Sequence, residues 1–188
     1  NLPHRSPSLQ GFKMYEGHRN KKELIDTTIL VGEKRLDAHR VLLSARVPFF
    51  KAMFTSSMVE CQQQEINLKE FDADSIEHLI SYAYTGRLTI TEQSVQLIMM
   101  AASFLQIDAV LDECADFLVR RLKVCNAVSI LLFCRSINYT KIEQKVNNFL
   151  DKNFVAISST PEFRQLTVEN ALSNLQRDSL HVDGEDQV

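Results

Sequence analysis

Hydrophobic residues recur along the first half of the chain with two different periods. Short apolar runs bounded by turn residues predict strands, and they fall at 28–31, 35–38 and 65–68, with a brief fourth run at 88–90. The first two runs are separated by Gly32-Glu33-Lys34, which predicts a hairpin. Apolar positions spaced by three or four residues predict helices at 39–46, 48–54, 75–84, 95–105 and 108–118. The segment 9–24 has a weaker helical signal, because Gly11 and Gly17 both disfavour a helix.

The helix predicted over 95–105 is apolar on nearly every side. Such a helix is stable only when other elements surround it, so we expect it at the centre of a first domain. Beyond Lys123 the pattern is purely helical, and two apolar stripes, over 127–137 and 142–150, predict an antiparallel helix pair. The fold class is therefore α+β: a helical cluster capped by a small, short-stranded sheet, joined without a flexible linker to an all-α region.

The overall composition is that of a globular protein, with 45% hydrophobic and 24% charged residues. A formal net charge of -3 provides no positive surface to attract nucleic acids or anionic lipids, so we expect neither as a partner. The longest charge-free stretch, 94–107, is shorter than the ~20 apolar residues that cross a bilayer, and no secretory signal opens the chain. We therefore expect a cytoplasmic protein, with the nucleus as the alternative compartment, and a disordered head over 1–10.

The residue types that usually carry chemistry are not arranged for it. The five glycines form neither a nucleophile elbow (G-x-S-x-G) nor a phosphate-binding loop. The four cysteines are scattered and the histidines isolated, which predicts no metal site. Cys61, in a predicted loop, is the one candidate for oxidation, and His39 is expected to cap a helix or lie at the edge of the core. The sequence thus predicts a non-catalytic protein without cofactors.

Five segments at matching spacing resemble the landmarks of the BTB (POZ) family. They are 24–31 (LIDTTILV), 37–45 (DAHRVLLSA), 48–54 (PFFKAMF), 82–86 (YAYTG) and 101–107 (AASFLQI). The second half resembles the BACK domain that follows BTB in kelch-like proteins, through Asn126-Ala127, the segment 149–154 and 163–166 (FRQL). The resemblance implies a BTB domain over 11–122 and the N-terminal part of a BACK domain over 123–188.

The same resemblance implies a function. Kelch-like members of the family are homodimeric adaptors that bind the N-terminal domain of cullin-3 in E3 ubiquitin ligases. In those proteins a C-terminal kelch domain, missing from this chain, holds the substrate protein. The alternative is a BTB self-association scaffold for transcriptional or cytoskeletal partners, without a ligase function.

Cullin-binding members carry a hydrophobic-x-Glu motif after the third helix, and Met58-Val59-Glu60 resembles it at that place. An apolar side chain that enters a pocket beside an orienting carboxylate is typical of an interface anchor. The alternative interpretation is a solvated loop that matches by chance. By resemblance, Phe54 and the segment 104–106 (FLQ) flank the same surface, with Phe54 and Leu105 as the expected contact residues. Their periodicity fits a place in the core equally well.

For the dimer interface, the resemblance implies an acidic residue at the first strand and a basic residue fourteen positions later. Asp26 and Arg40 match these positions, and an ordinary intramolecular salt bridge is the alternative interpretation. Phe12 and Tyr15 lie on the N-terminal helix that family members exchange across the dimer. Because Gly11 and Gly17 weaken this helix, we expect them to reduce the affinity of the dimer.

Overall fold

Three short strands form a small sheet at one side of the first half of the chain. The structure is a computed structural model that describes residues 7–56, 63–161 and 163, with side chains from Met14 onward. By its internal contacts the chain divides into two compact units, 1–114 and 115–188, and the division falls within a helix. The boundary that the sequence places after residue 122 stays a prediction.

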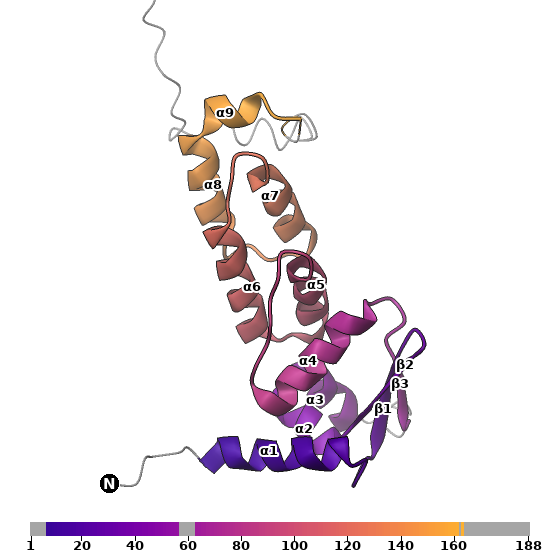
Figure 1. Cartoon of the computed structure of the whole chain (residues 1–188). Helices are drawn as coiled ribbons and strands as arrows, with labels where there is room; N and C mark the ends of the chain where they lie inside the picture. Colours follow the sequence, from indigo (N-terminus) through magenta and orange to yellow (C-terminus); the bar gives the residue numbers. More distant parts are fainter. Residues whose placement is uncertain (1–6, 57–62, 162, 164–188) are drawn as a thin grey trace, which may run out of the picture. The chain divides into compact units, whose positions relative to one another are not determined.

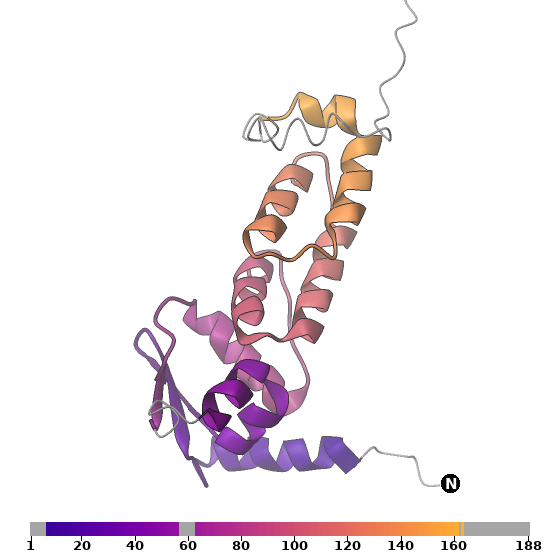
Figure 2. The same cartoon turned by 180° about the vertical axis from the view of Figure 1, so that it is seen from behind.

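The first unit contains both strands and helices. In chain order its elements are α1 (Pro7–Asn20), β1 (Thr27–Val31), β2 (Lys34–Ala38), α2 (Arg40–Arg46), α3 (Pro48–Thr55), β3 (Glu65–Asn67), α4 (Ala73–Thr85), α5 (Val95–Leu105) and α6 (Asp108–Arg120), which continues into the second unit. The sheet order is β2-β1-β3, with β1 antiparallel to β2 and parallel to β3. Figures 1 and 2 show the sheet at one side of α2, α3 and α4.

The period of the strand residues explains which face of the sheet is buried. Ile29 and Val31 on β1 are fully buried, and Thr28 and Leu30, which alternate with them, are half-buried. Ile29 pairs with Leu36 on β2 and with Ile66 on β3, so one apolar row crosses all three strands. The hairpin turn uses Gly32 at φ 60°, a left-handed conformation that glycine adopts without steric cost. The predicted fold class is confirmed.

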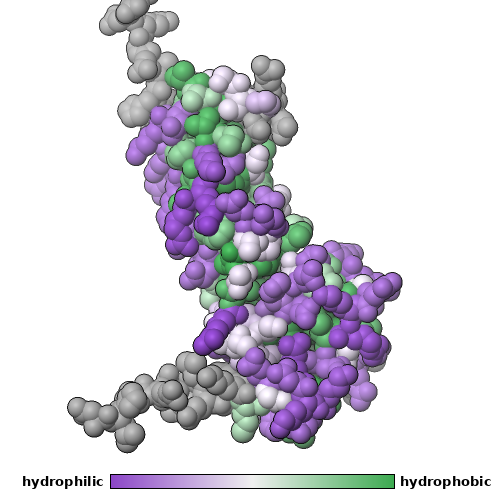
Figure 3. Space-filling view, viewed as in Figure 1, coloured by the Kyte–Doolittle hydropathy of each residue, from purple (hydrophilic) through white to green (hydrophobic). Residues whose placement is uncertain are grey.

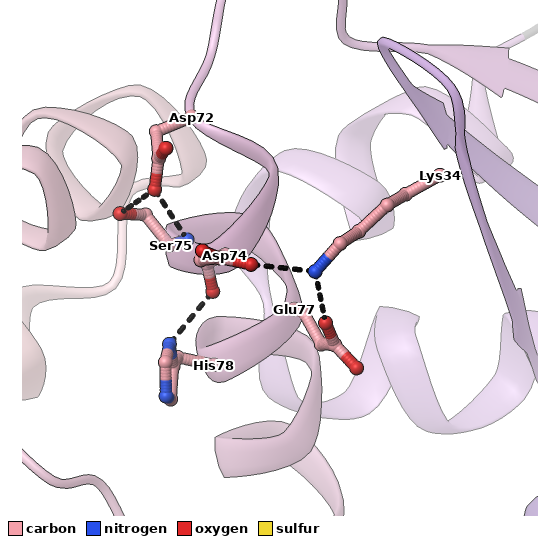
Figure 4. A network of polar contacts seen from close by, with 6 residues as sticks. All are labelled: Lys34, Asp72, Asp74, Ser75, Glu77 and His78. Carbon is pink, nitrogen blue, oxygen red and sulfur yellow. Dashed lines mark hydrogen bonds and ion pairs between the residues drawn. The ribbon is translucent and has the colours of Figure 1, made fainter.

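Both ends of α4 have capping residues, and Figure 4 shows the first of them. Asp72 precedes the helix, and its carboxylate accepts hydrogen bonds from the backbone N–H of Ser75 at 2.8 Å and from its hydroxyl at 2.7 Å. Gly86 ends the helix at φ 68°, a left-handed conformation that favours glycine at this position. Lys34 Nζ lies 2.8 Å from Glu77 Oε2 and 2.5 Å from Asp74 Oδ1, which raises the pKa of the lysine and connects the β1–β2 hairpin to α4.

A buried polar cluster connects the segment after α1 to α2 and α4. The Tyr84 hydroxyl accepts the backbone N–H of His39 at 2.9 Å and lies 2.8 Å from His39 Nδ1. Nε2 of the same ring lies 3.0 Å from the carbonyl oxygen of Glu23. Each polar group is satisfied when Tyr84 donates to Nδ1 and Nε2–H donates to Glu23. Burial raises the pKa of Tyr84 to about 12.

Three expectations about the first unit require correction. The helix α1 begins at Pro7, inside the stretch 1–10 expected to be disordered, and ends at Asn20 rather than at residue 24. The segment 88–90 is not a strand, because none of the described strands pairs with it; Leu88 and Ile90 instead line a cavity of about 420 Å³ with Val110. Helix α5 is not surrounded on all sides, since Leu97, Met100 and Phe104 are each more than 40% exposed.

The second unit is helical where the structure describes it. It contains α7 (Ala127–Ser136), α8 (Glu143–Lys152) and α9 (Phe154–Ser158). Leu131 on α7 and Val146 on α8 are fully buried, as the two predicted apolar stripes require. Arg135 Nε lies 3.5 Å from Glu143 Oε1 and connects the same two helices. Among the described residues, no helix is both long enough and apolar enough to span a bilayer.

The described cysteines differ in exposure, which leads to a prediction. Burial raises the pKa of the Cys114 thiol to about 12 and that of Cys134 to about 11, while Cys125 is exposed. Because the thiolate is the reactive form, we expect iodoacetamide at pH 8 to modify Cys125 in the folded protein and to spare the other two. Between pH ~9 and ~11 the two thiols ionise only in the unfolded chain, so the free energy of unfolding should fall as the pH rises through this range.

Mass spectrometry of peptides after timed alkylation measures the difference in reactivity between Cys125 and the two buried cysteines. The chain unfolded in guanidinium chloride is the control, since all its thiols are then accessible. Alkylation of Cys114 in the native protein at the rate of Cys125 would contradict the buried position.

Candidate partner-binding surface

Five phenylalanine rings form a connected cluster in the first unit, here called the phenylalanine cluster. Its members are Phe49, Phe50 and Phe54 on α3, Phe71 before α4, and Phe104 on α5. The ring centre of Phe104 lies 4.6 Å from that of Phe49 and 4.6 Å from that of Phe71. Phe50 lies 5.3 Å from Phe49 at a steep angle, and stacks on Phe54 at 5.8 Å. Such offset and edge-to-face pairs add stabilisation beyond the burial of their area.

The phenylalanine cluster extends from the core to the surface. Phe50 is fully buried, Phe49, Phe54 and Phe71 are half-buried, and Phe104 is 41% exposed. Leu97 and Met100 continue the exposed stripe of α5, since positions 97, 100 and 104 share one helix face. Most of the visible face of the first unit is hydrophilic in Figure 3, with hydrophobic side chains in small patches. A continuous apolar stripe on this unit is therefore a candidate surface for a protein partner.

The predicted hydrophobic-x-Glu motif follows α3 in the sequence. Helix α3 ends at Thr55, so Met58 comes shortly after the helix that carries Phe54. Met58, Glu60 and Cys61 lie outside the described residues. Their role in binding a cullin stays a prediction. The apolar residues of α3, by contrast, lie within the described part of the chain.

The predicted contact residue Leu105 is fully buried. A side chain without exposed surface cannot contact a partner in this conformation, so the position fits the alternative interpretation of Leu105 as a core residue. Phe104, its neighbour, is the exposed aromatic residue of this segment. At this end of α5, Phe104 rather than Leu105 is therefore available for contact in this conformation.

Asp26 and Arg40 are in contact, but not in the way that a salt bridge predicts. Oδ1 of Asp26 accepts the backbone N–H of Arg40 at 2.7 Å. This carboxylate caps the first turn of α2, whose own N-cap residue, His39, makes no side-chain cap hydrogen bond. The guanidinium of Arg40 lies over the ring of Phe54, with Cζ 4.3 Å from the ring centre. The structure thus brings together residues that the sequence assigned to two different sites.

Of the two predicted interface residues of α1, the structure describes the side chain of Tyr15 but not that of Phe12. The ring of Tyr15 is half-buried and lies 5.5 Å from the ring of His39, edge to face. Arg19, one turn later, donates from Nε to the carbonyl oxygen of Asp37 at 2.7 Å. These contacts fix the C-terminal half of α1 on its own unit. Phe12 belongs to α1, and its side chain lies outside the described residues.

Two features of this surface were missed by sequence reasoning. Phe71 lies between Glu70 and Asp72, and a single aromatic residue in a polar stretch was its only signal. The contact between Arg40 and Phe54 joins residues on two helices, so no periodicity could reveal it. Within the described part of the chain, no group of three or more His, Cys, Asp or Glu side chains could hold a metal ion.

Comparison with known protein families identifies both halves of the chain. A model described as the BTB/POZ domain matches residues 15–122, and one described as BTB And C-terminal Kelch (BACK) matches residues 127–188. The chain belongs to the BTB/POZ family, with a BACK region after the BTB domain. The predicted resemblance is confirmed.

Individual relatives place this BTB-BACK chain among kelch-like proteins. It is 35% identical over 181 residues to Kelch-like protein 7 of Homo sapiens, which covers 96% of this chain and 31% of the relative. It is 32% identical over 170 residues to Kelch repeat and BTB domain-containing protein 8 of Danio rerio, covering 90% of this chain and 28% of the relative. The chain therefore spans less than a third of the length of these relatives.

Proposed function

We propose that this BTB-BACK chain is the adaptor part of a cullin-3 ubiquitin ligase. In this proposal it forms a homodimer, binds the N-terminal domain of cullin-3, and catalyses no reaction itself. The substrate protein is held by a C-terminal domain outside this sequence, and the complex acts in the cytoplasm. The observation that carries the proposal is the BTB match over 15–122, which includes the hydrophobic-x-Glu motif at Met58 and Glu60.

The described surface next to that motif supports the proposal. A helical partner needs an apolar surface with a few side chains that enter pockets. The half-buried rings of Phe54 and Phe49 on α3, and the exposed Phe104 on α5, provide aromatic groups of the kind enriched in interfaces. Met58 would add a flexible apolar anchor, and Glu60 a carboxylate that orients the partner.

A second apolar set supports self-association. Met14 on α1 and Val41 on α2 are each 61% exposed, and Leu24 between these helices is 75% exposed. Exposed apolar side chains on neighbouring elements are typical of protein interfaces. Arg40, one of the predicted dimer residues, precedes Val41 at the start of α2. A homodimer through α1 and α2 would bury these side chains.

Two single substitutions test the cullin site. We expect Met58→Ala and Glu60→Ala each to weaken binding of a cullin-3 N-terminal fragment by about 1–3 kcal/mol, roughly 5- to 150-fold in Kd, because interface anchors have this range. Isothermal titration calorimetry measures the Kd. Val59→Ala is the matched control in the same segment and should leave the Kd nearly unchanged.

The proposal fails if both variants bind the fragment as tightly as the unmodified chain. A chain that forms dimers but does not bind the fragment would favour the alternative scaffold function.

A further inference from the structure

Arg40 contacts one residue of the predicted dimer interface and one residue of the predicted cullin-binding surface. Its backbone N–H donates to Asp26 Oδ1 at 2.7 Å, at the predicted subunit boundary. Its guanidinium carbon lies 4.3 Å from the ring centre of Phe54, on the predicted cullin surface. The first contact uses the main chain and the second uses the side chain. A substitution at position 40 can therefore remove the second contact and keep the first.

Two neighbours contact the ring of Phe54. Phe54 stacks on the fully buried Phe50 with ring centres 5.8 Å apart and an interplanar angle of 16°. The guanidinium of Arg40 covers the ring as well. A planar cation over an aromatic face is attracted by the ring quadrupole, and it restricts the ring to orientations that keep this contact. The orientation of Phe54 thus depends on a residue in another helix.

The position of the ring matters for the surface as a whole. Phe50 also contacts Phe49, and Phe49 contacts the exposed Phe104, so the rings on α3 and α5 pack as one connected set. A close-packed set of rings responds to a shift of one member by shifts of its neighbours. Holding Phe54 therefore helps to fix the shape of the apolar surface that a partner would meet.

We propose that Arg40 is a positioning residue for cullin binding: its guanidinium holds the ring of Phe54 in the orientation that the cullin fragment meets. This inference rests on the proposed function and adds to it. The resemblance implies that Arg40 lies at the dimer interface. In this proposal its side chain also shapes the surface of the same chain that binds the cullin. A cullin then depends on a residue that it need not touch.

A double-mutant cycle tests this role. Arg40→Gln removes the charge and the planar cation but keeps the backbone N–H that Asp26 accepts. We expect it to weaken binding of the cullin-3 N-terminal fragment about 3- to 10-fold by calorimetry, the range of a partly exposed cation–π contact. In the Phe54→Leu background the same substitution should cost clearly less affinity, because the ring it positions is absent. Arg40→Lys, which restores a cation, should recover part of the affinity.

Two measurements separate positioning from a general loss of structure. Arg35→Gln is the matched control, since Arg35 is an exposed arginine that pairs with Glu65 on the sheet, and it should leave the Kd unchanged. Thermal melting and solution mass of each variant show whether folding or self-association changes instead. If Arg40 had a structural role alone, Arg40→Gln would lower the melting temperature, and its effect on the Kd would be the same in the unmodified chain and in the Phe54→Leu variant.

The outcomes distinguish this inference from the function on which it rests. An unmodified chain that does not bind the fragment overturns both. If the unmodified chain binds, Arg40→Gln overturns the positioning role alone when its Kd is unchanged, or when it loses affinity equally with Phe54 and with Leu at position 54.

Discussion

Replacing Phe50 with alanine is expected to lower the free energy of unfolding of the BTB domain by about 3–5 kcal/mol, the range for a buried phenylalanine. The side chain is fully buried, and its ring contacts both Phe49 and Phe54. The substitution removes the transfer free energy of the ring and leaves a cavity that the surrounding rings fill only in part. Urea denaturation followed by circular dichroism measures the difference.

The same substitution at Phe104 is the control. Phe104 belongs to the phenylalanine cluster but is 41% exposed, so its removal leaves less of a cavity. We expect a loss of about 1–2 kcal/mol, near the centre of the range for single substitutions. Equal losses at the two positions would contradict the described gradient from core to surface.

The second large effect is expected from Tyr84→Phe, which removes a single oxygen atom. The hydroxyl accepts the backbone N–H of His39 and contacts its Nδ1, and both residues are at least 98% buried. Without the hydroxyl, one buried donor and one buried acceptor lose their partner, and each costs about 1–3 kcal/mol. We therefore expect the free energy of unfolding to fall by about 2–6 kcal/mol, the sum of the two costs.

Tyr82→Phe, two residues earlier in the same helix, provides the comparison. Tyr82 is half-buried and lines the cavity next to 88–90, so water can replace a contact of its hydroxyl. The expected change is within about 0.5 kcal/mol, as for most partly exposed substitutions. If Tyr84→Phe were equally neutral, the hydrogen bonds to His39 would not stabilise the domain.

Much of the fold could be predicted because local sequence patterns determine it. The hairpin follows from two apolar runs around Gly32, and α4 follows from its apolar period and from Gly86, which ends it at positive φ. The three described strands and the helices α2 to α8 occur where the periods predict them. These features depend on neighbours within a few residues, which the sequence displays directly.

Features that depend on contacts between distant elements could not be predicted in the same way. The run at 88–90 has the residue types of a strand, yet a strand also requires a hydrogen-bonded neighbour. The apolar residues of α5 predicted full enclosure, but Leu97 and Met100 are exposed, which the residue types alone do not distinguish. His39 was expected to be a capping or core-edge residue, and its buried contacts depend on Tyr84, 45 positions away.

The residues of the candidate site also differ in how far the sequence alone could identify them. The motif at Met58 and Glu60 was found only through resemblance to a family, because three residues have no period. Phe54 was placed correctly on an apolar helix face, but its contact with Arg40 requires the packing of α2 against α3. Leu105 and Phe104 are adjacent, and only the orientation of α5 shows which of them is exposed.

Light scattering, which gives the solution mass with and without a cullin-3 N-terminal fragment, tests the homodimeric adaptor in one measurement. Without the fragment we expect twice the 21.5 kDa of a single chain, and with the fragment in excess an increase by the mass of two fragments. Met58→Ala combined with Glu60→Ala should keep the dimer mass and lose the increase. A mass of 21.5 kDa that does not change when the fragment is added would rule out the homodimeric adaptor.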